Sequence, residues 1–270
     1  MNNYEKSQYE AIKKWKSEEP SVVSQAVGIV FKLASWLIEK IIPSKAIEEV
    51  LSGCNMMAEW FCDIDDIKSD ANVVFISELK TKDLELSDKL ADEVHNWAVA
   101  AATGESGVAG FFELPGMIVD IPALITLGLR VIHKIGVCYG FESKSEDDKN
   151  FVLSILSTAG ANTIKEKNTS VLLLRQISVK IAKDSWGKIV NQKVPLSVAI
   201  IAIKSLAKQL GINITKRMAL PAIIPFIGTG VGAEINAPFI NDIAWAARRA
   251  FQERWLIENQ LIDIECEVIA

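Results

Sequence analysis

Residues 104–141 read GESGVAGFFELPGMIVDIPALITLGLRVIHKIGVCYGF, an apolar stretch punctuated by glycine and proline that decides the fold. Asp120 followed by Pro122 is typical of a helix start, where the aspartate caps the first turn and the proline lies within it. The pattern predicts a helix over Ile121–Tyr139 that stops at Gly140. The glycines at 104, 107, 110 and 116 permit close backbone approach or left-handed dihedral angles just before this helix.

Apolar residues recur at helical intervals through most of the remaining chain. No group of alternating segments predicts a β-sheet, so the expected fold class is all-α, a single multi-helix globular bundle. We expect further helices over Tyr4–Lys16, Ser21–Ile42, Ser44–Glu59, a segment starting at Ser87, Phe151–Trp186 with a break near Gly160, Val198–Leu210 and Phe239–Gln260.

Three local signals refine these boundaries. Ser87 is a plausible N-cap for the helix that follows it, and Ser145 with Asp148 three residues later resembles a capping box. The acidic stretch Asp63–Asp70 is the least apolar connector, and we expect it to be a surface loop.

The composition allows a large core and excludes one class of partner. Hydrophobic residues make up 50% of the 270 residues, and the mean hydropathy of +0.22 requires a core, an interface or a membrane surface to take up apolar side chains. The formal net charge of −5 disfavours nucleic acid as the main partner.

The longest charge-free run is Met218–Ala233, about sixteen residues that include Pro221 and Pro225. This run is shorter than the roughly 20 apolar residues that span a bilayer. Gly228 and Gly232 have the GxxxG spacing that lets two helices approach closely, in a soluble bundle or in a membrane. Residues 104–141 and 218–240 therefore form two apolar, Gly/Pro-rich helical hairpins in this interpretation, and a membrane-inserted hairpin stays an alternative.

The four cysteines have no metal-ligand spacing, and residues 1–10 contain no secretory signal. The cytoplasm is therefore the expected compartment. The chain has two histidines, and we interpret His95, beside Trp97, as a core or rim histidine. A zinc site made of His95, His133 and a carboxylate is the less favoured alternative, so we expect neither metal nor cofactor.

Polar residues within the central segment are the best candidates for chemistry. The segment lacks the GxGxxG, GxxxxGK[ST] and GxSxG patterns of nucleotide-binding proteins and hydrolases. Helix capping by Asp120, and the helix dipole acting on Arg130, His133 and Lys134, account for these residues at least as well as catalysis does. The candidates for a polar pocket inside the apolar shell are Glu105, Asp120, Arg130, His133 and Tyr139.

Two blocks of sequence resemble the EcsC protein family. The first is TGESGVAGFFELPG at 103–116 with DIPAL at 120–124, RVIH at 130–133 and YGF at 139–141; the second is PAIIPFIGTGVG at 221–232 with ARRAFQERW at 247–255. The similarity extends from Tyr4 to Trp255, although residues 117–119 make a longer, more apolar approach to Asp120 than in some members. The motif residues are Gly107, Gly110, Pro115, Asp120, Pro122, His133, Tyr139, Gly140, Gly228 and Gly232.

The resemblance implies a bacterial, largely helical protein without an established reaction. The family is named for a gene beside an ABC transporter operon linked to secretion and competence. The expected organisation is an amphipathic helix over residues 1–19 and an EcsC-like helical domain over 20–260.

The leading hypothesis is a cytoplasmic accessory protein without catalysis, peripheral to the inner face of the cell membrane. Its expected partner is the membrane surface or a membrane protein, and its oligomeric state stays open. A second hypothesis is a hydrolase or transferase acting on an apolar, lipid-like substrate through His133 with Asp120 or Glu105. A third is a membrane-active effector in defence or competition.

Overall fold

The computed structural model describes residues 1–20, 63–103, 121–161, 163–187 and 231–264. This part of the chain contains seven α-helices, one short 3-10 helix and no strand, which confirms the all-α prediction. The elements are α1 (Asn3–Ser17), α4 (Asp65–Ala71), η1 (Ile76–Thr81), α5 (Leu84–Thr103), α6 (Ile121–Cys138), α7 (Glu146–Ala159), α8 (Ile164–Ser185) and α10 (Val231–Glu258).

Several predicted features lie outside the described residues. These are the helices expected at 21–42, 44–59 and 198–210, the glycine-rich residues 104–120, and the apolar run up to residue 230. Glu105, Gly107, Gly110, Pro115, Asp120 and Gly228 belong to this group.

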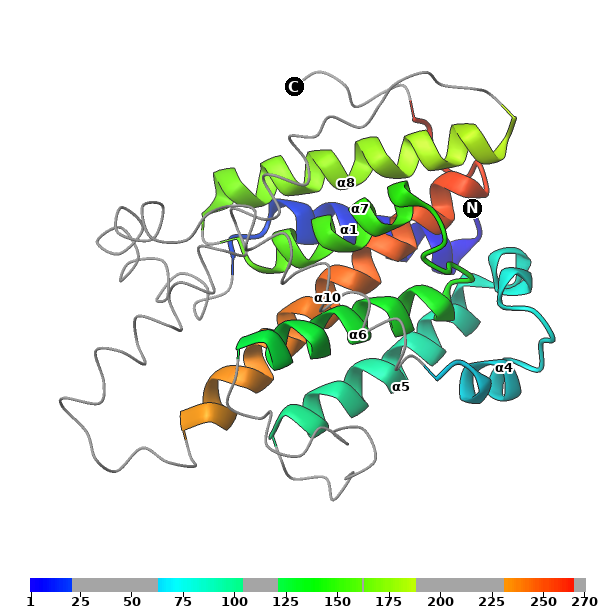
Figure 1. Ribbon diagram of the computed structural model, residues 1–270. Coiled ribbons are helices and arrows are strands. Elements are labelled where there is room, and N and C mark those ends of the chain that lie inside the picture. The colour runs from blue at the N-terminus through cyan, green and yellow to red at the C-terminus, as the bar shows by residue number, and fades with distance from the viewer. Residues whose placement is uncertain (21–62, 104–120, 162, 188–230, 265–270) are drawn as a thin grey trace.

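The long helix α10 occupies the centre of the bundle. It packs against α5 and α6 on one side, against α7 and α8 on the other, and also against α1 (Figure 1). Its buried positions combine small side chains, such as Ala244 and Ala247, with the large rings of Phe251 and Trp255 further along the helix. The alanines bring neighbouring helices close, while the aromatic rings fill the space between them. Every other long helix that the structure describes therefore uses α10 as a packing partner.

The prediction of a surface loop over Asp63–Asp70 is wrong, because residues Asp65–Ala71 form α4. Ile67 and Ala71, four residues apart, are both buried and give this short helix an inward face. Asp65 and Asp66 lie in its first turn, where carboxylates are favoured by the helix dipole. The acidic residues thus made the segment polar without preventing helix formation.

Two predicted helix starts also need correction. Helix α5 begins at Leu84, so Ser87 is a buried residue of the helix and not its N-cap; its backbone N–H bonds to the carbonyl of Asp83. Helix α10 begins at Val231 and not at Phe239, and it passes through Pro238. Proline in a helix interior removes one backbone donor, but buried residues on both sides, Ala237 and Ile240, keep this helix packed in the bundle.

Other local predictions are confirmed. Helix α6 ends at Cys138, and Gly140 follows it with a φ of 86°, in the left-handed region that favours glycine. Ser145 and Asp148 form the expected capping box of α7. Gly160 ends α7, and α8 begins four residues later, at Ile164.

Candidate functional site

Tyr139 joins four parts of the bundle through the buried carboxylate of Asp88. Its hydroxyl donates to Oδ1 of Asp88 at 2.5 Å, and Gln252 of α10 donates to the same oxygen at 2.7 Å. The hydroxyl of Tyr4, on α1, donates to Oδ2 at 2.7 Å. Burial and the neighbouring Asp88 raise the pKa of both tyrosines, so both stay protonated donors. The cluster therefore binds α1, α5 and α10 to the end of α6.

Gly140 and Phe141 continue this contact surface. A Cβ atom on Gly140 would lie 2.7 Å from the backbone nitrogen of Lys80, so the backbones of η1 and the α6 terminus touch here. The ring of Phe141 stacks on Phe251 at 5.8 Å between centroids, and the guanidinium of Arg254 lies 4.2 Å from its centre. The YGF and ARRAFQERW segments, far apart in the sequence, thus meet in the core.

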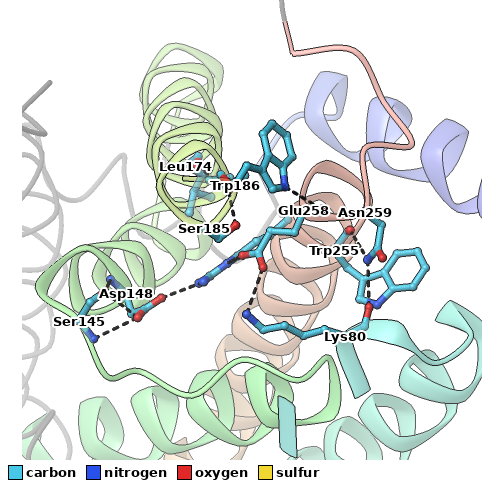
Figure 2. A network of polar contacts seen from close by, with 12 residues as sticks. Lys80, Ser145, Asp148, Leu174, Ser185, Trp186, Trp255, Glu258 and Asn259 are labelled. Carbon is cyan, nitrogen blue, oxygen red and sulfur yellow. Dashed lines mark hydrogen bonds and ion pairs between the residues drawn. The ribbon is translucent and has the colours of Figure 1, made fainter. Parts of the chain in front are cut away.

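Arg254 is the centre of a buried ionic network, and Figure 2 labels the other members Asp148, Glu258 and Lys80. It pairs with Asp148 of α7 at 2.9 Å and with Glu258, one turn further along α10, at 2.9 Å. Glu258 also pairs with Lys80 at 3.1 Å. Burial opposes ionisation of Asp148, but Arg254 and hydrogen bonds from Ser145 outweigh it and lower its pKa. The network holds α7, η1 and the end of α10 together.

His133 contacts the segment that follows α6. Its Nδ1 lies 3.0 Å from Oγ of Ser143, and burial, with a smaller contribution from Lys149, lowers its pKa to about 4. The imidazole is therefore neutral at pH 7. Its neighbour Lys134 forms an ion pair with Asp66 of α4 at 2.5 Å, and Arg130 lies half-buried on the same helix.

His95 is buried and bonded within the bundle, as expected of a core histidine. Its Nε2 lies 3.0 Å from Oδ1 of Asn241, and its ring meets Trp245 edge-on. Burial, together with Arg248, lowers its pKa, although the Asn241 contact opposes this. Among the residues described, no group of three or more His, Cys, Asp or Glu side chains could hold a metal ion.

An exposed apolar pair stands out on the surface. Val74 and Phe75 lie between α4 and η1, and they are 72% and 67% exposed. Backbone N–H groups of both residues donate to Oε1 of Glu78, at 3.1 and 2.7 Å. Val73 and Ile76, on either side, are buried. We call residues 73–76 the apolar tip; it is fixed by its buried neighbours and by Glu78.

The described candidates from the central segment point to different partners. Tyr139 contacts Asp88, whereas His133 contacts Ser143. Pro122 and Gly232 lie within the first turns of α6 and α10. Sequence reasoning missed Asp88, Gln252 and the Asp148–Arg254–Glu258 network; a carboxylate among the apolar inward positions of α5 was the signal available for Asp88.

The described residues define an α-helical bundle around α10, in which the motif residues Tyr139 and Gly140 join helices to one another. The model of the EcsC protein family matches residues 6–256, and the chain belongs to this family. It is 21% identical over 187 residues to the uncharacterized protein YdbA of Bacillus subtilis (strain 168), covering 68% of this chain and 63% of that protein. The chain thus spans less than two thirds of the length of this relative. No solved structure matches the chain. Within the described residues, no helix is both long enough and apolar enough to span a membrane.

Proposed function

We propose that the chain is a membrane-peripheral accessory protein of the transporter or secretion type, acting at the inner face of the cell membrane by binding. The observation that carries this proposal is the apolar tip. Val74 and Phe75 are exposed on a segment whose backbone is held by Glu78. A partner can therefore bind these two side chains without any rearrangement of the helices. Exposed apolar patches can mark sites of protein or membrane interaction, and Val74 and Phe75 are the most exposed large apolar side chains among the described residues.

The roles of the motif residues support binding over catalysis. Tyr139 and Arg254 are used in contacts between helices, and their partners Asp88 and Asp148 are themselves buried. With a pKa of about 4, His133 is a weak general base at neutral pH, because an efficient base has a pKa near the working pH.

The His133–Ser143 contact favours a second candidate, a hydrolase or transferase acting on an apolar substrate. The distance of 3.0 Å is within the range for proton transfer from a serine nucleophile. Turnover of a panel of p-nitrophenyl acyl esters that is lost in Ser143→Ala would establish this candidate. Equal rates for wild type and Ser143→Ala would remove it.

Cell fractionation tests the leading proposal. The chain is produced in bacterial cells, and lysates are separated into membrane and soluble fractions at low ionic strength. We expect the protein in the membrane fraction, and we expect alkaline carbonate to release it, as it releases peripheral proteins. A wholly soluble protein that also fails to sediment with vesicles made from the same membranes would overturn the proposal.

A further inference from the structure

Negative charge is concentrated around the apolar tip. Residues 63–93 contain ten carboxylates and four lysines, a formal charge of −6, whereas the whole chain has −5. The rest of the chain is therefore close to neutral. Asp65, Asp70 and Glu78 on α4 and η1 are exposed, as are Asp83 and Glu85 at the start of α5. Residues 63–93 thus account for the net negative charge of the chain.

The lysines of this region do not neutralise it. Lys68 pairs with Asp65 at 3.3 Å, and Lys80 is directed inward, to Glu258 and the ring of Phe141. Lys82 and Lys89 are exposed. From outside the region, Lys134 pairs with Asp66 and Arg248 pairs with Asp92. The other exposed carboxylates still outnumber the two lysines, so a partner approaching the tip meets a negative potential; they are Asp63, Asp70, Glu78, Asp83, Glu85 and Glu93.

The tip also borders a surface hollow. Lys68, Ser69, Asn72, Val73 and Val74 line a hollow of about 270 Å³. Asn72, with a φ of 50°, turns the chain out of α4 at this point. Val74 lines the hollow, whereas the exposed Phe75 next to it does not. A partner with two apolar side chains could therefore cover Val74 with one and Phe75 with the other.

We propose that the apolar tip binds a lysine- or arginine-rich segment with apolar side chains, of the kind found in cytoplasmic loops of integral membrane proteins. Such loops carry an excess of Lys and Arg, and they complement the carboxylates around Val74 and Phe75. The same carboxylates repel anionic lipid headgroups, and a second copy would bring an equally acidic surface. The inference rests on the proposed function and names the partner through which the chain reaches the membrane.

A defined peptide tests this inference. The probe is a fluorescein-labelled peptide of lysine and leucine, with leucine at helical i, i+3, i+4 and i+7 spacing and a length of about four helical turns. It is titrated with the intact protein at low salt and followed by anisotropy. We expect the Val74→Ser, Phe75→Ser double variant to bind about 30-fold more weakly, since it loses the burial of two apolar side chains. Leu172→Ser, which changes a half-exposed side chain on α8 across the bundle (Figure 1), is the matched control and should bind like wild type.

A second pair of variants tests the charge. Asp70→Lys reverses an exposed charge on α4, and Glu10→Lys makes the same change on α1, where the side chain is 70% exposed. We expect Asp70→Lys to weaken peptide binding about threefold and Glu10→Lys to leave it unchanged. Binding should also decline steeply as the salt concentration rises toward about 1 M, where the Debye length is about 3 Å.

Each alternative occupant has its own signature. Binding to anionic vesicles that the tip variant loses, without any peptide binding, would overturn the inference in favour of lipid. A dimer that the tip variant converts to a monomer would overturn it in favour of a second copy. Membrane fractionation separates the two proposals: if the tip variant still sediments with membranes, this inference fails and the proposed function stands. If instead the wild type is wholly soluble but binds the peptide through the tip, the proposed function fails and the binding of basic segments by the tip stands.

Discussion

Replacing Gly140 with alanine should break the contact between α6 and η1. Gly140 has a φ of 86°, and the added Cβ would lie 2.7 Å from the backbone nitrogen of Lys80 and 3.2 Å from the carbonyl oxygen of Ile76. The left-handed conformation alone costs an L-residue about 1–2 kcal/mol. Displacing backbone in a packed region adds about 1–3 kcal/mol. Because neither contacting atom is the flexible end of a side chain, the two contributions add, and we expect a total loss of about 2–5 kcal/mol.

Gly187 supplies a matched control. Its φ is 72°, and a Cβ there would meet no atom within 4 Å. Gly187→Ala should therefore lose only the conformational contribution, about 1–2 kcal/mol. The measurement is urea unfolding, followed by far-ultraviolet circular dichroism and tryptophan fluorescence. Equal losses in the two variants would refute the close backbone approach at Gly140, because the reasoning requires a difference of at least about 1 kcal/mol.

Three further predictions concern buried polar groups. His133 has a pKa of about 4 in the fold against 6.5 unperturbed, so its contribution to stability is complete above pH 6.5 and decreases by about 3 kcal/mol as the pH falls toward 4. In urea unfolding, His133→Gln should lack this decrease in the free energy of unfolding between pH 6.5 and 4. An unchanged dependence on pH would contradict the lowered pKa of His133. Asp88→Ala leaves the buried donors Tyr139 and Gln252, and the half-buried Tyr4, without their acceptor. It should lower the free energy of unfolding by about 3–5 kcal/mol, whereas Tyr4→Phe, which removes one donor, should lose about 1–2 kcal/mol. Similar losses in calorimetry would refute the central role of Asp88. Lys167 donates to the backbone carbonyls of Trp15 and Glu18 at the end of α1. Lys167→Met should therefore speed amide hydrogen exchange in α1, while α5 keeps its protection. Unchanged exchange in α1 would contradict the stabilisation of this helix by Lys167.

The sequence predicted the helices whose signals are local. Ser145 and Asp148 lie three residues apart, and the Gly140 stop directly follows the last turn of α6, so both could be read within a few residues. The helix α4 was missed because its acidic residues dominate the composition of 63–70, although Ile67 and Ala71 had the spacing of a buried helical face. The predicted start of α10 at Phe239 was wrong. A proline normally marks a helix boundary, but Pro238 lies inside a helix that tertiary packing holds together.

The candidate site was less predictable, since its residues come together only in three dimensions. Asp88 is 51 positions from Tyr139 and 164 from Gln252, and nothing in the local sequence of α5 indicates either partner. Tyr139 and His133 were selected as motif residues, but their partners Asp88 and Ser143 were not. The apolar tip was missed because all four residues 73–76 are apolar, and only the fold determines that Val73 and Ile76 are buried while Val74 and Phe75 are exposed.

The central position of α10 has a consequence for the order of events during synthesis. Residues 231–258 leave the ribosome after α1, α4, α5, α6, α7 and α8 have been made, yet α10 is the helix on which five of these six pack. Until it emerges, Asp88 lacks Gln252, Asp148 lacks Arg254 and Lys16 lacks Glu253. Nascent chains that end before α10 therefore expose apolar faces and unpaired charges together, the condition in which chaperones are needed. Folding of this bundle is completed from its C-terminal side, after most of the chain has been translated.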